Sequence, residues 1–363
     1  KRSADISKWV ATDVLNKTYD IIIIIPSYAE SLTLLDTLSS INEQVDVNIQ
    51  NTLVIVVINN ERNPETSIYN DNLKTHSMLS LLEVNYDLSI IDCYTSTNWI
   101  EDKRFGVGYV RKVGLDNAIW YSNEKTLLCW LDADTTIESG YIKKLTTYYK
   151  SNLCSSLVTN FNHSDNESTS LNEYIHKYEI FLKSTAQKLA DIGSIYKYVP
   201  LGPTITCTAE TYIYIGGLTP KKATEDFYFI QDLCKYGNIM FAEDIYVYPS
   251  SRLSSRVYLG TGYRMTMAAK GEDIESLYFS KLSFQILSNM LIILLKSYND
   301  SYEQLIDKIN DIDSNLLSFL NKQGFAKSWD GINNSSPTQK HFEMQFQRYF
   351  DWLKTIKLLK YYS

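Results

Sequence analysis

The chain has 363 residues, of which 44% are hydrophobic and 21% are charged, and its formal net charge is −7. This composition is typical of a folded globular protein and excludes a disordered chain. A net negative charge argues against non-specific nucleic-acid binding, because contacts to phosphates require clustered Lys and Arg.

The cysteines and the N-terminus bear on the cellular compartment. Five widely spaced cysteines form no Cys-x-x-Cys pair, and the first residue is Lys1, not Met. This spacing supports neither a zinc site nor a disulfide framework and favours a reducing compartment. No signal peptide is visible, so we expect a cytoplasmic location, with association at the cytoplasmic membrane face as an alternative. Whether the native chain extends before Lys1 is left open.

The first 135 residues alternate between apolar runs and amphipathic segments. Residues 3–15 have helical spacing and predict a leading helix within segment 1–18. Strands are predicted at 19–31, 52–60, 88–94 and 126–134, and the first three are followed by predicted helices at 32–44, 69–84 and 108–122. This alternation predicts βαβ units in a doubly wound, mainly parallel sheet. Ligands of such sheets bind beyond the carboxyl ends of the strands, where the loops after Ile25, Ile58 and Leu131 converge.

The second half of the chain is mixed and then helical. We predict strands at 155–161 and 238–249, helices near 168–189 and 223–236, and a helical region beyond about 270. The apolar run 279–296 contains Lys, Ser, Gln and Asn, so a core helix is favoured over a membrane span.

The C-terminal segment has apolar residues along one helical face: Phe342, Phe346, Phe350, Leu353 and Ile356. Such a stripe is typical of a core or a dimer contact. Peripheral membrane contact near a lipid-linked acceptor is the alternative.

The stretch "LDADT" after the fourth predicted strand is compatible with two enzyme classes. Asp132 and Asp134 project to the same side of an extended chain, where their oxygens suit Mg²⁺ or Mn²⁺ bound to a nucleotide. Alternatively, Asp132 is the nucleophile of a haloacid-dehalogenase-type phosphatase. That alternative is disfavoured because such a nucleophile normally follows the first core strand, whereas three βα units precede it here.

Four motifs together resemble family 2 glycosyltransferases, in that family's order: "IIIIIPSYAES" (21–31), "GVGYVRKVGLDNA" (106–118), "LDADT" (131–135) and "GGLTPKKATEDFYF" (216–229). The resemblance implies a GT-A fold, an αβα sandwich around a mainly parallel sheet. It further implies a nucleotide-binding half at 19–135, an acceptor half at 136–265 and a helical C-terminal region at 266–363.

The resemblance also implies roles for individual acids. Asp134 is a metal ligand, Asp132 contacts the metal or the ribose, and Asp226 is the general base of an inverting transfer. Glu225 is a neighbouring catalytic or structural contact. A retaining transferase on the same fold is an alternative, in which Asp226 holds the acceptor. The cofactor is Mn²⁺ or Mg²⁺, and the donor is a UDP- or GDP-linked sugar.

The expected donor contacts lie in the first half of the chain. Pro26, Tyr28 and Glu30 close the first strand, Tyr28 as a stacking partner for the base, and Arg111 contacts the base or the phosphates. Many family members have an aspartate for uracil after the second strand. Asn59 stands there instead, so the choice between UDP and GDP stays open.

Three arginines follow the acceptor motif, namely Arg252, Arg256 and Arg264. Guanidinium groups bind phosphate oxygens in pairs, so this segment is either a diphosphate-binding loop or a solvated basic loop. The acceptor is left open among a glycan, a lipid-linked sugar and a small molecule, as in polysaccharide or glycolipid biosynthesis. A homodimer is a further alternative.

Overall fold

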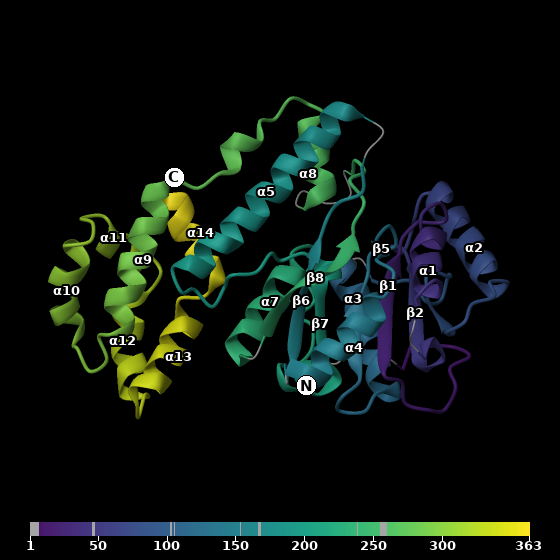
Figure 1. Cartoon of the computed structure of the whole chain (residues 1–363), viewed down its shortest axis with the longest axis horizontal. Coiled ribbons are helices and arrows are strands. Elements are labelled where there is room, and N and C mark those ends of the chain that lie inside the picture. The colour runs from purple at the N-terminus through teal and green to yellow at the C-terminus, as the bar shows by residue number, and fades with distance from the viewer. Residues whose placement is uncertain are drawn as a thin grey trace. The chain divides into compact units, whose positions relative to one another are not determined.

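The computed structural model describes residues 7–45, 48–101, 104, 106–152, 154–165, 168–237, 239–254 and 260–363. The chain divides into two compact units, each shown in Figure 1. The α/β unit consists of Lys1–His176 and Pro200–Glu272, and the helical unit consists of Lys177–Val199 and Asp273–Ser363. The predicted class, α/β with a helical C-terminal region, is confirmed.

The α/β unit contains one sheet in the order β3-β2-β1-β4-β7-β6-β8-β5. The pairs β3-β2, β2-β1, β1-β4 and β6-β8 are parallel, and the other three pairs are antiparallel. Its strands are β1 Ile21–Ser27, β2 Thr52–Asn59, β3 Asp87–Cys93, β4 Leu127–Trp130, β5 Thr136–Ile137, β6 Ser156–Phe161, β7 Ile205–Thr208 and β8 Ile239–Tyr248.

The parallel half of the sheet follows from its unbroken β-branched runs. Residues Ile21–Ile25 and the whole of β2 are buried, as expected for strands covered on both faces. Ser27 on β1 pairs with Ile58 on β2, and Ile24 pairs with Trp130 on β4. The carboxyl ends of these three strands therefore lie side by side, as the sequence predicted.

The helices of the α/β unit are α1 Leu34–Asn42, α2 Thr66–Ser80, α3 Val107–Ala118, α4 Tyr141–Asn152, α6 Ala209–Tyr214, α7 Glu225–Tyr236 and α8 Thr261–Ala268. Helix α5, Thr169–Asp191, belongs to this unit up to His176. Helix α3 packs against β1 and β2. This approach requires Gly114, because a Cβ there would lie 2.4 Å from the Ile24 side chain. Helix α3 is thereby held close to the strand ends.

The helical unit contains α9 Lys281–Leu295, α10 Tyr302–Asn310, α11 Leu316–Lys322, α12 Phe325–Asn334, α13 Gln339–Tyr349 and α14 Trp352–Tyr361. Phe342, Phe346 and Phe350 are at most 3% exposed and belong to its core with Trp329. The three phenylalanines of the C-terminal stripe are therefore core and Ile356 packs against this core, whereas Leu353 is 36% exposed. Phe350 lies between α13 and α14, so the stripe spans two helices. Segment Ile274–Leu295 is long and apolar enough to cross a membrane, but α9 contributes Leu287, Met290 and Leu294 to the same core.

Two predictions about organisation differ from the structure. Residues 7–15 form turns and irregular backbone, so the leading helix is absent from the described part of its range. The helical unit begins at Asp273 instead of 266 and also includes Lys177–Val199. The second difference arises because Leu189 and Ile192 at the end of α5 pack into the core of the C-terminal helices.

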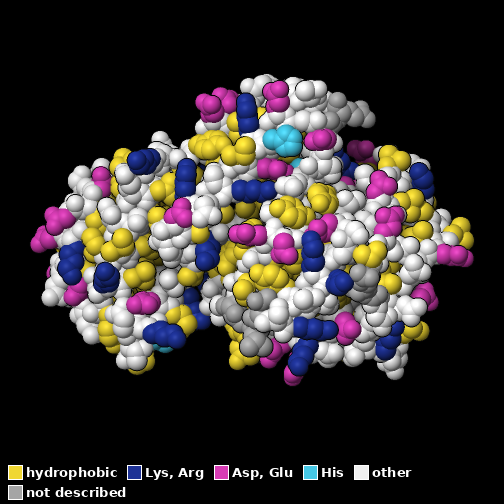
Figure 2. Space-filling model, viewed as in Figure 1, with side chains coloured by type: hydrophobic (Ala, Val, Ile, Leu, Met, Phe, Trp, Pro, Cys, Tyr) yellow, Lys and Arg dark blue, Asp and Glu magenta, His cyan; other side chains and the backbone are white. Residues whose placement is uncertain are grey.

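The two signs of charge are mixed on the surface. On the face of each unit seen in Figure 2, Lys and Arg side chains are interspersed with Asp and Glu. This mixing accompanies the moderate net charge of −7.

Candidate active site

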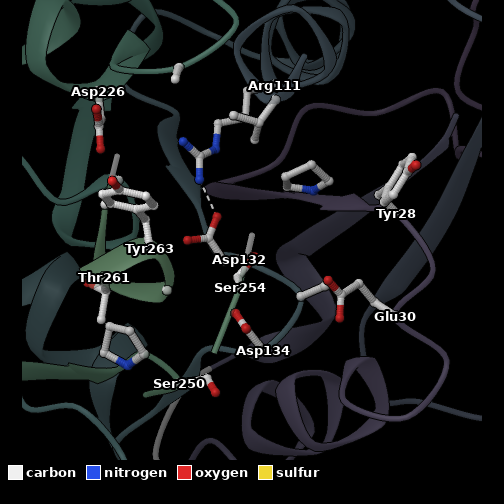
Figure 3. A pocket seen from close by; sticks show the side chains of 18 of the residues that line it. Tyr28, Glu30, Arg111, Asp132, Asp134, Asp226, Ser250, Ser254, Thr261 and Tyr263 are labelled. Atoms are coloured by element: carbon white, nitrogen blue, oxygen red, sulfur yellow. Dashed lines mark hydrogen bonds and ion pairs between the residues drawn. The ribbon is translucent and has the colours of Figure 1, made fainter. Parts of the chain in front are cut away.

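A cavity of about 620 Å³ in the α/β unit brings together most of the predicted site residues (Figure 3). Those that line it are Pro26, Tyr28, Glu30, Asn59, Arg111, Asp132, Asp134 and Asp226. The first four come from the ends of β1 and β2, and the two aspartates of "LDADT" follow β4. Asp134 and Asp226, which are 92 positions apart in the sequence, therefore face one space.

Arg111 on α3 connects the two sides of the cavity. Its guanidinium donates to Asp132 through Nη2 and to Glu225 through Nη1. Burial opposes its charge, but Asp132 and Glu225 raise the pKa of Arg111 overall. Gly202 packs closely against the guanidinium, since a Cβ there would lie 2.9 Å from Arg111 Nη1 and 3.0 Å from Nη2. Arg111 is thus fixed in place and holds the strand β4 acid against the start of α7.

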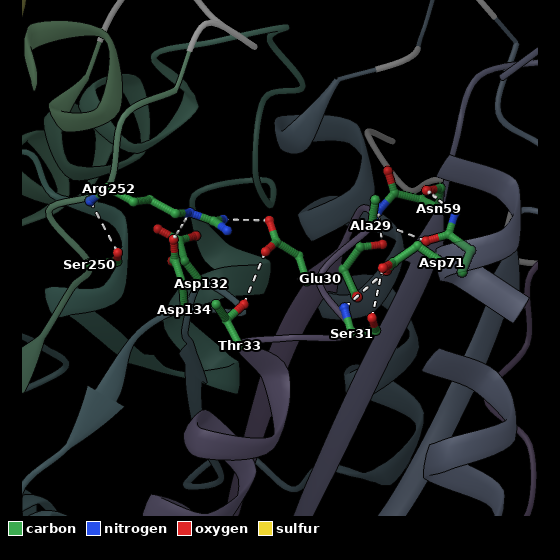
Figure 4. A network of polar contacts seen from close by, with 12 residues as sticks. Ala29, Glu30, Ser31, Thr33, Asn59, Asp71, Asp132, Asp134, Ser250 and Arg252 are labelled. Carbon is green, nitrogen blue, oxygen red and sulfur yellow. Dashed lines mark hydrogen bonds and ion pairs between the residues drawn. The ribbon is translucent and has the colours of Figure 1, made fainter. Parts of the chain in front are cut away.

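Arg252, which also lines the cavity, makes a second bridge (Figure 4). Its Nε lies 2.7 Å from Asp134 Oδ2, and its Nη2 lies 2.6 Å from Glu30 Oε1. Glu30 also accepts a hydrogen bond of 3.0 Å from Thr33 Oγ1. The side chain of Arg252 is 37% exposed, whereas that of Arg111 is 5% exposed. The two arginines therefore differ in their freedom to move.

Asp226 lies in the first turn of α7, across the cavity from Asp134 in Figure 3. Thr224, the N-cap residue of α7 and two positions before Asp226, has φ 67°, in the left-handed region that costs a non-glycine residue about 1–3 kcal/mol. Burial and the neighbouring Glu225 raise the pKa of Asp226 to about 7, against the opposing effect of Arg111. A strained backbone position thus lies two residues before an acid whose pKa is raised to about 7, and both features are common at functional sites.

The carboxylates after β4 fit a hard divalent cation. Burial, with repulsion from Asp132 and Glu30, raises the pKa of Asp134 to about 6 despite Arg252. Asp132 and Asp134 each keep one oxygen that accepts no side-chain hydrogen bond from the described residues. No group of three or more His, Cys, Asp or Glu that could hold a metal occurs in the described chain. The donor set therefore suits an ion such as Mg²⁺, which takes one or two carboxylates and completes its shell with phosphates and water.

The wall formed by β1 and β2 is fixed by side-chain amides. Ala29, with φ 53°, donates its N–H to Asn72 Oδ1 at 3.0 Å. Asn59 Nδ2 donates to Ser27 O at 2.8 Å and to Val57 O at 3.3 Å. These two acceptors orient the amide, so Asn59 Oδ1, which accepts no hydrogen bond from the described residues, is the atom left for a ligand. The hydroxyl of Tyr28 lies 3.3 Å from Glu61 Oε1.

Two predicted residues lie outside the cavity lining, and a third is not among the described residues. Glu225 is 3% exposed and engages Arg111, and it does not line the cavity. Arg264 pairs with Glu272 at 3.1 Å, also outside the cavity lining. Arg256 lies outside the described residues.

Sequence analysis missed part of the cavity wall. Leu201, Gly202, Lys222 and segment Gly260–Tyr263 line the cavity. Gly202 belongs to none of the four sequence motifs, and its closeness to Arg111 depends entirely on the tertiary fold. For segment Gly260–Tyr263 the sequence contains one local signal. Gly260 is the N-cap of α8, and glycine is a favoured residue at that position.

Comparisons with known proteins give structural likeness at low identity. No protein-family model and no curated protein matches the sequence. TarS residues 1–349 from S. aureus, solved with UDP-GlcNAc, is 15% identical, with 91% of each chain covered and a TM-score of 0.47. The mannosyltransferase PcManGT from Pyrobaculum calidifontis, solved with GDP-Man and Mn²⁺, is 12% identical, with 94% of this chain and 90% of that one covered and a TM-score of 0.45. At these values, function has to be inferred from the residues of this chain.

Proposed function

We propose that this protein is a metal-dependent glycosyltransferase that moves a sugar from a nucleoside-diphosphate sugar to an acceptor hydroxyl with inversion. The observation that carries the proposal is one cavity with Asp132 and Asp134 on the β4 side and Asp226 on the α7 side. One side can hold the diphosphate of a donor, and the other can take a proton from an acceptor. The GT-A fold implied by the sequence motifs likewise has a donor-binding side and an acceptor-binding side.

The donor would lie across the ends of the parallel strands. Tyr28 offers a ring for the base and Asn59 offers a carbonyl for its edge. Asp134 and Asp132 would hold a divalent cation, which stabilises the negative charge that develops on the leaving diphosphate. Asp132 is oriented by its bond to Arg111, so this carboxylate is preorganised before any ligand enters.

Asp226 would act as the general base. An inverting transfer needs one carboxylate to remove the acceptor proton while the acceptor oxygen attacks the anomeric carbon. The raised pKa of Asp226, about 7, makes this carboxyl a better proton acceptor than an exposed aspartate when it is ionised. Glu225, buried beside it, raises that pKa and anchors Arg111, which is a positioning role.

A thermal-shift assay tests the donor side of the proposal. We expect UDP or GDP, or their sugars, to raise the Tm of the full chain with Mn²⁺ present, and to raise it much less with EDTA. The panel includes UDP-GlcNAc and GDP-mannose. The metal-dependent part of the shift should disappear in Asp134→Ala, because that variant removes the carboxylate proposed to hold the cation. Equal shifts in Asp134→Ala and the unchanged protein would contradict the proposal.

The fixed amide of Asn59 predicts which bases are accepted. Because Nδ2 is engaged by Ser27 O and Val57 O, the ligand meets only the acceptor Oδ1. Uracil and guanine present a ring N–H to such an acceptor, whereas cytosine and adenine present a ring nitrogen lone pair. We expect UDP or GDP to bind at least about tenfold more tightly than CDP and ADP, which corresponds to about 1.4 kcal/mol.

Calorimetric titration of the four diphosphates with Mn²⁺ measures this preference. In Asn59→Ala the preference should shrink toward unity while the affinity for CDP stays within about threefold. Tight binding of ADP or CDP by the unchanged protein would refute the role of Asn59.

A further inference from the structure

We propose that Arg252 is an internal counter-ion that occupies the candidate cation site in the ligand-free protein and leaves it when a nucleoside diphosphate binds. This inference rests on the proposed function. It adds that the cation and the nucleotide bind cooperatively, because Arg252 has to leave the cation site for the phosphates. The basis is the bridge from Arg252 to Asp134 and Glu30.

The bridge joins two acids that arrive from different strands. Asp134 follows β4 and Glu30 follows β1, and their side chains are 17% and 6% exposed. Two such carboxylates close together need a cation, since an unpaired buried charge is strongly unfavourable. The fork of Arg252 supplies it through separate nitrogens, Nε to Asp134 and Nη2 to Glu30.

The same geometry makes Arg252 a competitor of a divalent ion. A cation on Asp134 would share that carboxylate with a guanidinium whose Nε lies 2.7 Å from Oδ2, and two positive groups beside one carboxylate repel each other. Arg252 therefore has to move away before the cation is held firmly. Its side chain is 37% exposed and lines the cavity, so it has space to turn, whereas buried Arg111 has none.

A nucleoside diphosphate provides the new partner. A guanidinium group can bind two phosphate oxygens at once through two parallel hydrogen bonds. These charge-assisted bonds are stronger than those of neutral donors. The backbone of Arg252 stays anchored, because its N–H donates to Ser250 Oγ at 3.2 Å. The diphosphate would thus draw the guanidinium from the two acids while the cation replaces its charge. Cation and nucleotide should then bind with positive coupling, which is reciprocal for the two ligands.

The test is a set of binding titrations on the full chain, with Mn²⁺ binding followed by electron paramagnetic resonance and UDP and GDP binding by calorimetry. In Arg252→Gln we expect the affinity for Mn²⁺ alone to rise about tenfold or more. We expect the affinity for nucleotide in EDTA to fall, and the coupling between the two ligands to shrink toward unity. A purely structural arginine would not move the two affinities in opposite directions.

A second variant and a control complete the design. Arg252→Lys keeps a positive charge between the acids and preserves folding, but a single ammonium cannot reproduce both contacts, so a smaller rise in Mn²⁺ affinity is expected. Lys17→Gln removes a cation of matched exposure, 36%, whose ion pair with Asp87 at 2.9 Å lies outside the cavity lining. It should bind Mn²⁺ and nucleotide like the unchanged protein.

The outcomes separate this inference from the proposed function. Unchanged Mn²⁺ affinity in both Arg252 variants, with coupling to nucleotide intact, would overturn the counter-ion role and leave the metal-dependent transferase standing. Absence of Mn²⁺ binding in every protein, with or without nucleotide, would overturn both.

Discussion

Replacing Asp226 by Asn is expected to lower turnover by about 10²–10⁴-fold, the usual contribution of a positioned general base. The amide keeps the shape of the side chain but cannot accept the acceptor proton. Nucleotide affinity should stay within about threefold, because the donor contacts lie on the β1, β2 and β4 side of the cavity. Single-turnover sugar transfer together with calorimetric nucleotide binding measures both quantities.

The raised pKa of Asp226 predicts how turnover and the effect of this substitution on Tm depend on pH. In the unchanged protein, turnover should rise with pH through about 7, as the carboxyl ionises. The folded-state pKa lies above the ordinary 3.8, so the folded protein binds the proton more tightly and loses stability between pH 4 and pH 7. Asp226→Asn removes this loss. Its Tm should therefore exceed that of the unchanged protein at pH 8, and the difference should vanish near pH 4.

Asp232→Asn is the matched control, because Asp232 is another acid of α7 that does not line the cavity. It should leave turnover and its pH profile unchanged. Full activity in Asp226→Asn would refute the base role. A lower Tm of that variant at pH 8 would contradict the raised pKa.

Replacing Arg111 by Leu is expected to give the largest loss of stability. Asp132 and Glu225 would lose their shared cation, and Glu225 is 3% exposed. Removing one partner of a buried ion pair costs about 3–5 kcal/mol. For a unit of this size, each kcal/mol lowers Tm by about 2–4 °C, so a fall of about 6–20 °C is expected. Differential scanning calorimetry of the full chain measures it.

The companion variants distinguish a buried bridge from a surface one. Arg111→Leu combined with Glu225→Gln should recover part of the lost stability, since the amide carries no unpaired charge. Lys144→Gln breaks the more exposed pair with Glu138, 2.9 Å long, and should cost about 0–1 kcal/mol. If Arg111→Leu had the Tm of the unchanged protein, Arg111 would be a ligand contact without the structural role assigned to it.

The first four strands and their parallel arrangement could be predicted from the sequence, whereas the order of the strands in the sheet came from the structure. Runs such as Ile21–Ile25 and 53–58 are apolar at every position, which is typical of strands buried on both faces. Because the carboxyl ends of such strands meet, Tyr28, Asn59 and Asp132 were expected in one region. The leading helix was wrong over residues 7–15, where tertiary contacts hold an irregular backbone instead. Trp9 is 4% exposed, and the N–H of Ala11 donates to Asn117 Oδ1 at 3.1 Å.

Sequence alone determined the residue types that carry the proposed chemistry: two acids two positions apart after β4, and a third that opens α7. The tertiary structure decided their partners. Glu225 turned away from the cavity toward Arg111, Gly202 approached that guanidinium, and Arg252 bridged Glu30 and Asp134. The physical reason is that residue spacing fixes which side of a strand or helix a side chain occupies. Ion pairing inside a low-dielectric interior depends on distances between elements that are far apart in the chain.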